Sequence, residues 1–270
     1  MSLRYAAVLS SLRSLRGDPA IAPIAPTRAA LPYRNVRHRG IAPVADIYVP
    51  AHATGASVLL VHGGGFVIGS RQMKPMRYLA ARLAAAGIAV CTFDYRMIFR
   101  GGHLDEAVTD ARDAFAFWSR EVPALGLDPQ AISIAGLSAG ATIALLASTE
   151  LAPASITACF GLYEIDHLRG PAQLLPRMLF GTTDRSTWQQ RSPRFAPQPA
   201  APVLLLHGSD DGLVPVAQAH RLAAHRESLG LPTRLVIYDQ VPHGFFNLPL
   251  PAAEAGAAEL VAHVLAARNR

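Results

Sequence analysis

The sequence has little lysine, little cysteine and no long apolar run, and these shortages exclude several classes of protein. Lys74 is the only lysine among 270 residues, and charged residues make up 16% of the chain against 51% hydrophobic residues. An intrinsically disordered chain shows the opposite balance. No apolar run approaches the roughly 18 residues that a membrane-spanning helix needs, so the sequence predicts no integral membrane segment. We expect one large globular domain with a deep core.

The chain has only two cysteines, Cys91 and Cys159, and both lie inside apolar runs typical of core strands. This placement favours buried free thiols over a disulfide and is consistent with a reducing compartment. Residues 1–16 lack the charged start, apolar stretch and cleavage site of a secretory signal, although they are acid-poor and rich in serine and arginine, as transit peptides are. A cytoplasmic location is therefore the expectation.

The positive charge of the chain is confined to its first 40 residues. The net charge is +6, and the rest of the chain carries 18 basic and 18 acidic side chains, which balance. A basic arm of this kind can contact a membrane surface, an acidic partner or nucleic acid. We favour a solvated or cross-packed arm and expect no nucleic-acid partner. The arm contains one acid, Asp18, and seven arginines: Arg4, Arg13, Arg16, Arg28, Arg34, Arg37 and Arg39.

Beyond the arm, short apolar runs alternate with longer helical patterns. Nearly continuous apolar runs are typical of strands covered on both faces in a parallel sheet, and the alternation predicts crossover units of an α/β fold. We therefore expect a mostly parallel central sheet with helices on both faces. The strands are expected at 46–50, 57–62, 88–93, 132–136, 156–160, 203–207 and 234–239, and the helices near 73–86, 104–121, 140–151, 215–229 and 252–268.

Two segments depart from this alternation. In the N-terminal arm or minimal cap, residues 1–45, we expect a short amphipathic helix that places Val8, Leu12 and Leu15 on one face. The stretch 17–32 that follows is rich in proline and alanine and is expected to be an irregular connector. Residues 161–202 form an unusually long connection, which is a candidate lid. Its leucines at 174, 175 and 179, with Met178 and Phe180, either line a pocket or pack as a helix on its rim.

The sequence Gly136-Leu137-Ser138-Ala139-Gly140 joins an expected strand directly to an expected helix. A serine on such a sharp turn projects its hydroxyl above the sheet, and the flanking glycines avoid collisions with neighbouring backbone. A serine hydroxyl becomes a nucleophile when a base removes its proton and donors stabilise the resulting oxyanion. We therefore interpret Ser138 as a catalytic nucleophile, with the N–H of Ala139 as one oxyanion donor.

Three consecutive glycines, Gly63 to Gly65, follow another expected strand in the sequence "VHGGGF". Such a segment lets backbone N–H groups turn toward a cavity, so Gly63 and Gly64 are the expected partners of Ala139 in an oxyanion hole. The alternative is a flexible glycine turn without a catalytic role. The position of the segment ahead of a serine turn favours the oxyanion hole.

The expected general base is His243, in the loop after the last strand and ahead of the final helix. A carboxylate must hold its tautomer and stabilise its charged form. Asp210 and Asp211 follow the preceding strand and are the main candidates, while Glu164 and Asp166 are less favoured. His62 and His207 end strands and are expected to make structural hydrogen bonds. No spacing of ligands suggests a metal site.

With these residues in place, the chain resembles the α/β-hydrolase superfamily, and within it the carboxylesterases of the "HGGG" type, which include compact alkyl esterases and arylformamidases. The resemblance covers roughly residues 45–268 and makes residues 46–270 the catalytic domain. It implies that Asp211 is the acid, because the family places the acid four residues before the proline that is Pro215 here. It also implies a structural role for Arg96. The stretch "MIFRGGH" after Arg96 departs from the family pattern and leaves substrate size open.

The resemblance and the residues together imply a serine carboxylesterase that cleaves short- to medium-chain esters through an acyl-enzyme. One alternative is an amide hydrolase similar to arylformamidases, acting on N-formylkynurenine-type substrates. Another is a non-catalytic ligand-binding protein on a hydrolase scaffold. The expected partner is a small-molecule ester, no cofactor is required, and a homo-oligomer is compatible with the sequence.

Overall fold

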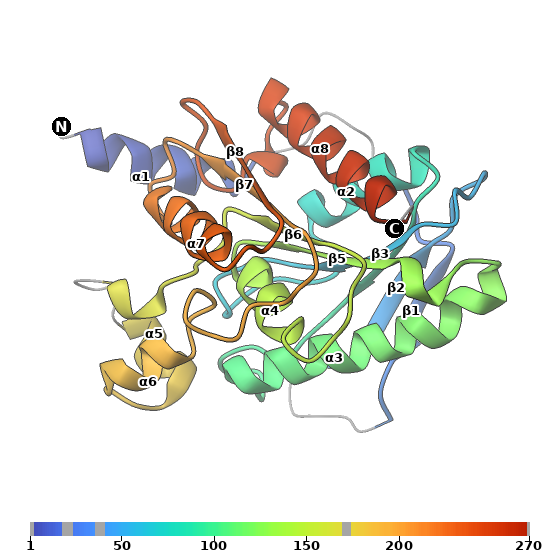
Figure 1. Cartoon of the computed structure of the whole chain (residues 1–270), viewed down its shortest axis with the longest axis horizontal. Coiled ribbons are helices and arrows are strands. Elements are labelled where there is room, and N and C mark those ends of the chain that lie inside the picture. The colour runs from blue at the N-terminus through green and yellow to red at the C-terminus, as the bar shows by residue number, and fades with distance from the viewer. Residues whose placement is uncertain (1–2, 18–23, 36–40, 169–173, 269–270) are drawn as a thin grey trace.

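The protein is built around one twisted sheet flanked by helices (Figure 1). The computed structural model describes residues 3–17, 24–35, 41–168 and 174–268. Within these residues the sheet has eight strands in the order β1-β2-β4-β3-β5-β6-β7-β8. Strand β2 pairs antiparallel with both β1 and β4, and all other neighbours pair parallel. The strands are β1 Arg28–Pro32, β2 Val44–Tyr48, β3 Ser57–Val61, β4 Ala89–Phe93, β5 Ile132–Leu137, β6 Ile156–Cys159, β7 Val203–Gly208 and β8 Thr233–Tyr238.

Helices cover both faces of the sheet, which confirms the predicted α/β class. Alternate residues of one strand enter two different cores: Leu59 and Val61 pack on one face, and Val58 and Leu60 on the other. This is why the strands are continuously apolar in sequence. On one face lie α3 Leu104–Glu121, α4 Ala139–Ala147 and α7 Ala217–Ser228, and on the other α2 Lys74–Ala85 and α8 Pro251–Arg268.

The remaining helices are short or lie outside these two layers. None of the helices in the described part of the chain is both long and apolar enough to cross a membrane. The two cysteines are buried free thiols, as predicted. The other helices are α1 Leu3–Ser14, η1 Val122–Leu125, η2 Pro129–Ala131, η3 Ile165–His167, α5 Leu174–Phe180, α6 Arg185–Gln190 and η5 Phe245–Asn247.

The expectation that residues 17–32 form only an irregular connector is wrong for their last part. Residues 28–32 form the edge strand β1, with Leu31 paired to Ala45 of β2. The buried carboxylate of Asp46 accepts a hydrogen bond from the N–H of Ala30 and fixes the strand. Pro32 is tolerated because it lies at the end of an edge strand. Backbone pairing at the sheet edge therefore outweighs the composition of the segment.

The helix predicted in the arm exists as α1, and the face that carries Leu12 is turned to solvent. Leu12 and Leu15 are exposed, whereas Ser11 and Ser14 are buried. The hydroxyl groups of these two serines bond backbone groups of neighbouring loops, as described below, so hydrogen bonding and not apolar burial sets the orientation of the helix.

Part of the basic arm is cross-packed, as expected. Arg28 pairs with Glu121 at the end of α3, and Arg34 pairs with Asp110, whose side chain is almost fully buried. Asp110 also binds the guanidinium of Arg96, which ties the loop after β4 to α3. The structural role expected for Arg96 is therefore observed.

Candidate active site

Loops at the carboxyl ends of the parallel strands bring a hydroxyl, an imidazole and a carboxylate into one line. The Ser138 Oγ atom lies 2.9 Å from Nε2 of His243, and Nδ1 of His243 lies 2.6 Å from Oδ2 of Asp211. Because Nδ1 faces a carboxylate, it carries the proton, and Nε2 is left to accept from the serine hydroxyl. In the chain, Ser138 lies 105 residues before His243, and Asp211 lies 32 residues before it.

The turn at Ser138 has the geometry that its glycines suggest. Ser138 has φ of +51°, a left-handed value that is uncommon for a residue with a side chain. A Cβ atom on Gly136 would lie 2.1 Å from the Gly140 carbonyl oxygen, and one on Gly140 would lie 2.2 Å from that of Val61. Both glycines are therefore required for β5 and α4 to meet this closely.

The glycine segment after β3 faces the serine. A Cβ atom added to Gly63 would lie 3.3 Å from Cβ of Ser138, and Gly63, Gly64 and Ala139 line the same pocket as Ser138 and His243. Ala139 is the first residue of α4, so its N–H has no acceptor within the helix. The glycine segment, Ser138 and Ala139 therefore lie around one pocket.

A buried histidine supports this segment from behind. The His62 ring stacks on Tyr95 at 4.1 Å between ring centroids, and its Nδ1 lies 2.7 Å from the Gly63 carbonyl oxygen. Burial lowers the pKa of His62 to about 4, so the ring is neutral at physiological pH. The structural hydrogen bonding expected for His62 is observed.

The Asp211 carboxylate has a donor on every side. Its Oδ1 accepts from the N–H groups of Leu213 (2.9 Å) and Val214 (2.8 Å), while its Oδ2 lies next to both His243 and His207. Burial alone raises the pKa of this carboxyl, but the hydrogen bonds from His207 and His243 hold it far below its usual range. Asp211 is therefore ionised at any working pH.

His207 is the second histidine at this carboxylate, and it is fully buried at the end of β7. Its Nε2 lies 3.1 Å from Oδ2 of Asp211 and 3.0 Å from the carbonyl oxygen of Val214. Both atoms are acceptors, so Nε2 carries a proton. Its Nδ1 has no hydrogen-bond partner among the residues that the structure describes. His207 therefore acts as a donor to Asp211, a more specific role than the structural hydrogen bond expected from sequence.

Helix α1 fixes the two loops that carry the imidazole and the carboxylate. The Ser11 hydroxyl oxygen accepts from the N–H groups of Gly212 (3.0 Å) and His243 (3.1 Å). The Ser14 hydroxyl lies between the carbonyl oxygens of Ser11 and His243. A Cβ atom on Gly212 would lie 2.3 Å from the backbone of Ala7, so helix and loop are in direct contact. The N-terminal arm is therefore part of the site.

A pocket of about 440 Å³ opens above Ser138, within the range of ~300–1,000 Å³ common for small-molecule sites. The Phe160 ring packs edge-on against the imidazole of His243, with 5.0 Å between ring centroids. Apart from the glycines, Ser138, His243 and Asn247, the lining is apolar. It includes Leu15, Phe66, Ile68, Met73, Leu137, Phe160, Leu162, Leu168, Leu175, Leu213 and Val214.

The candidate lid contributes to the pocket through Leu168 and Leu175, whereas Leu179 is buried behind it and Leu174 is exposed. The segment therefore combines the two expected arrangements, because α5 both lines the pocket and packs on its rim. A second hollow, of about 340 Å³, lies beside His103 and Met178 and contains none of the residues at Ser138.

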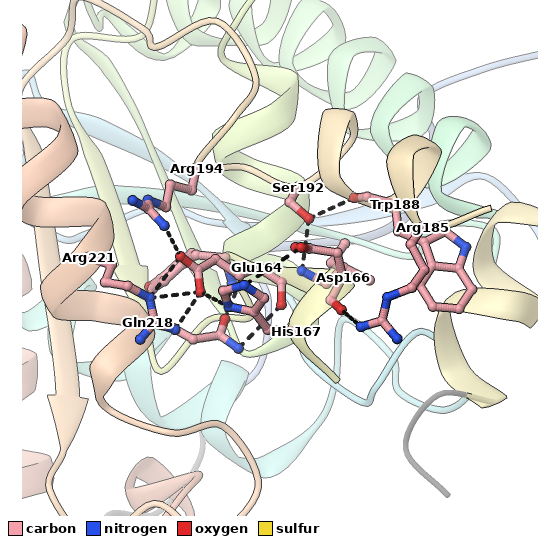
Figure 2. A network of polar contacts seen from close by, with 11 residues as sticks. Glu164, Asp166, His167, Arg185, Trp188, Ser192, Arg194, Gln218 and Arg221 are labelled. Carbon is pink, nitrogen blue, oxygen red and sulfur yellow. Dashed lines mark hydrogen bonds and ion pairs between the residues drawn. The ribbon is translucent and has the colours of Figure 1, made fainter. Parts of the chain in front are cut away.

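The base of the lid is held by a buried carboxylate, Glu164 (Figure 2). Arg194, from the end of the segment, and Arg221, from α7, both bind its oxygens, and His167 lies 2.5 Å away. Burial raises the pKa of Glu164, but the hydrogen bonds from the two arginines outweigh it and lower the pKa overall. Glu164 is thus engaged away from His243 and does not serve as its acid.

Four further hydrogen bonds hold the base of the lid in the region shown in Figure 2. The Gln218 side-chain oxygen accepts from the N–H groups of Tyr163 and Glu164, at 2.7 and 2.9 Å. The Ser192 hydroxyl accepts from the N–H of Ile165 at 2.8 Å. The backbone of Asp166 accepts from Arg185, so the other less favoured acid also belongs to the lid base. Asp210 is exposed, which leaves Asp211 at the histidine.

Sequence reasoning missed four residues that contact the line of polar groups: Ser11, Ser14, Phe160 and His207. His207 carried a signal, because it lies four residues before Asp211 in a strand-to-loop junction. The serines carried none, since their partners lie more than 200 residues away. Among the described residues, no group of three or more histidine, cysteine or acidic side chains is placed to hold a metal.

The chain is similar in sequence to proteins named as esterases and hydrolases. A family model described as BD-FAE matches residues 45–167. A rice protein named "Probable isoprenylcysteine alpha-carbonyl methylesterase" is 31% identical over 229 residues, covering 73% of this chain and 54% of its own. "Ethyl acetate hydrolase" of Pseudomonas putida is 28% identical over 218 residues, covering 72% and 67%. The chain spans about half the length of the first curated relatives that it matches.

Solved esterase structures share the fold. Thermogutta terrifontis esterase 2 phosphonylated by sarin superposes with a TM-score of 0.73 at 24% identity, covering 88% of this chain and 94% of its own. A hormone-sensitive lipase from a metagenome library superposes with a TM-score of 0.74 at 20% identity, covering 99% of each chain. The chain therefore has the α/β-hydrolase fold, and the proteins it is similar to are named as esterases and lipases.

Proposed function

We propose that the protein is a serine carboxylesterase that cleaves esters with short- to medium-length acyl groups through an acyl-enzyme. The observation that carries this proposal is the hydrogen-bonded line from Ser138 through His243 to Asp211, at 2.9 and 2.6 Å. The names of the relatives, which include methylesterases and an ethyl acetate hydrolase, support the ester as the bond that is cleaved.

In the first half of the reaction, the Ser138 oxygen attacks the ester carbonyl carbon while Nε2 of His243 takes the hydroxyl proton. The carbonyl oxygen becomes an oxyanion, which the N–H groups of Gly63, Gly64 and Ala139 stabilise. The carbon–oxygen bond to the alcohol then breaks, and His243 returns the proton to the leaving alkoxide. The products are a free alcohol and Ser138 esterified by the acyl group.

In the second half, His243 removes a proton from water, and the oxygen of that water attacks the acyl carbon. The bond to Ser138 breaks as His243 protonates the serine oxygen, and the free acid leaves. Asp211 stays ionised throughout and stabilises the positive charge on His243 in both halves. No cofactor is needed, because the three side chains and the backbone N–H groups supply nucleophile, base and charge stabilisation.

The lining of the pocket supports the proposal that the substrate carries an apolar acyl group. Leucine, methionine and phenylalanine side chains dominate its lining next to Ser138, and no Asp, Glu, Lys or Arg is among the described residues that line it. Such a lining favours an alkyl or aryl chain over a charged one, because burying an unpaired charge costs free energy. No contact in the pocket specifically favours a formamide over an ester.

The test is hydrolysis of p-nitrophenyl esters from acetate to decanoate by the wild type, Ser138→Ala and a matched control, Ser228→Ala, whose serine is exposed. We expect turnover with an optimum at short or medium chains, a loss of at least roughly 10³-fold in Ser138→Ala, and no change in the control. A phosphonate probe should add its mass to the peptide that contains Ser138 and to no other serine peptide.

The same preparation is tested on ethyl acetate, on methyl esters and on N-formylkynurenine. A large preference for the formamide would replace the ester proposal with the amide alternative. A wild type that binds but does not cleave any of these compounds would favour the ligand-binding alternative. Retained activity in Ser138→Ala would contradict the assignment of the nucleophile.

A further inference from the structure

The outer face of α1 is unusual because it exposes leucines while the inner face buries serines. Leu9, Leu12 and Leu15 are 43, 47 and 47% exposed. They recur every three residues, so they form one stripe along the helix surface. A helix on a globular domain normally turns such a stripe toward the core, and here it faces away.

The contacts of the inner face show why the stripe cannot turn inward. Ser11 and Ser14 are buried against the loops of Gly212 and His243 and bond their backbone groups. Rotating the helix to bury the leucines would leave those N–H groups unpaired and push leucine side chains into loop backbone. The exposed stripe is therefore a fixed feature of the folded chain.

The stripe is continuous with the rim of the pocket. Leu15 belongs to the stripe and also lines the pocket. Ile68, which is not part of the stripe, lines the same pocket and is 62% exposed. Across the mouth, Leu174 is 60% exposed beside the pocket residue Leu175. An apolar surface thus extends from α1 to the entrance through which a substrate reaches Ser138.

Basic side chains accompany the stripe. Arg13 and Arg16 are exposed between and after its leucines, and neither forms an ion pair with another described residue. The first 17 residues contain no acid. A second copy packed symmetrically on this face would bring arginines against arginines, which opposes self-association. An anionic lipid layer offers both an apolar interior for the leucines and negative charge for the arginines.

We propose that α1 and the adjoining pocket rim form a docking surface for anionic lipid membranes. The leucines of the stripe enter the boundary between headgroups and acyl chains, and Arg13 and Arg16 contact the headgroups. The pocket mouth then faces the membrane, so the substrates are apolar esters dissolved in the lipid layer. The inference about the substrates rests on the proposed esterase function, whereas the inference of a docking surface does not.

The test is co-sedimentation of the full chain with vesicles of phosphatidylcholine alone and of phosphatidylcholine with phosphatidylserine. We expect binding to the anionic vesicles that weakens with salt. Arg13→Gln/Arg16→Gln should lower the partition coefficient roughly 30-fold, since each basic residue near an anionic surface contributes about fivefold. Leu9→Ser/Leu12→Ser should lower the partition coefficient by about 10- to 30-fold, because each variant side chain loses the free energy that the exposed part of a leucine gains when it enters the lipid layer.

The matched control is Leu229→Ser/Arg120→Gln. Both residues are exposed: Leu229 directly follows α7, and Arg120 lies in the last turn of α3. These two helices lead into β8 and, through η1 and η2, into β5, so their ends lie at the amino end of the sheet, opposite the site. This variant should bind like the wild type. All variants should hydrolyse a water-soluble ester normally, because none of the four residues changed in and just after α1 lines the pocket.

Absence of binding to anionic vesicles at low salt would overturn the proposal. So would equal loss of binding in the control, or a dimer in sedimentation equilibrium that Leu9→Ser/Leu12→Ser abolishes while vesicle binding is absent. Vesicle binding by a chain that cleaves no ester would contradict the proposed function and leave the docking surface standing. The two proposals can therefore fail separately.

Discussion

Replacing His207 by phenylalanine tests whether the second histidine controls the carboxylate of Asp211. The change keeps a planar ring of similar size in a fully buried position and removes the Nε2 donor, which lies 3.1 Å from Oδ2 of Asp211. Asp211 retains two N–H donors at Oδ1 and His243 at Oδ2. The carboxylate then loses one of four stabilising contacts.

The size of the effect follows from this contact. A hydrogen bond to a charged group contributes about 1.5–3 kcal/mol, and the His207 proton is shared with the Val214 carbonyl, so we take the lower end. A loss of about 1.5 kcal/mol corresponds to roughly a tenfold fall in kcat/KM.

The assay is kcat/KM on p-nitrophenyl butyrate at neutral pH, with His207→Gln as the comparison. Glutamine places an N–H donor near the position of Nε2, so this variant should keep most of the wild-type activity. Thermal unfolding of both variants reports loss of packing separately. A phenylalanine variant with unchanged kcat/KM, or equal losses in both variants, would refute a specific role of His207.

Three further predictions concern the supports of the site. Ser11→Ala/Ser14→Ala leaves buried N–H groups without an acceptor, at about 1–3 kcal/mol each. It should lower both the melting temperature and kcat with little change in KM, and an unchanged kcat would contradict the role given to α1. Glu164→Gln should lower the melting temperature at pH 7. The folded-state pKa of Glu164 is lowered, so its carboxylate stabilises the fold above about pH 4.3 and progressively less below it. The difference in melting temperature between this variant and the wild type should therefore shrink in acid. A difference that stays constant with pH would argue against the ion pairs. Gly140→Ala forces a side chain to within 2.2 Å of a backbone oxygen, so it should abolish folding or activity, and normal turnover would contradict the described turn.

Most of the sheet could be predicted from the sequence because buried parallel strands are apolar on both faces. The seven runs between 46 and 239 became β2 to β8 with ends shifted by one or two residues. The turn at Ser138 could be predicted for a related reason: the need for glycine at 136 and 140 is local and leaves a mark in the sequence. Features that depend on local steric requirements can therefore be predicted from the sequence.

The features that could not be predicted depend on distant partners. Strand β1 is held by backbone pairing with β2 and by Asp46, so its proline-rich composition gave no sign of it. The orientation of α1 depends on loops more than 200 residues away, whose N–H groups select serine over leucine for the buried face. The second donor to Asp211 required knowing which way His207 points at the end of its strand.

The clamp around Glu164 separates the chemistry of this protein from its choice of substrate. It fastens the start of the long segment to α7 through Gln218 and Arg221, and it ties Ser192 and Arg194, at the end of the segment, back to residues 164–165 (Figure 2). Leu168 and Leu175, which line the pocket, lie between these two attachments and are not part of the clamp. Substitutions at these two positions therefore give a direct route to new acyl specificities on an unchanged catalytic frame.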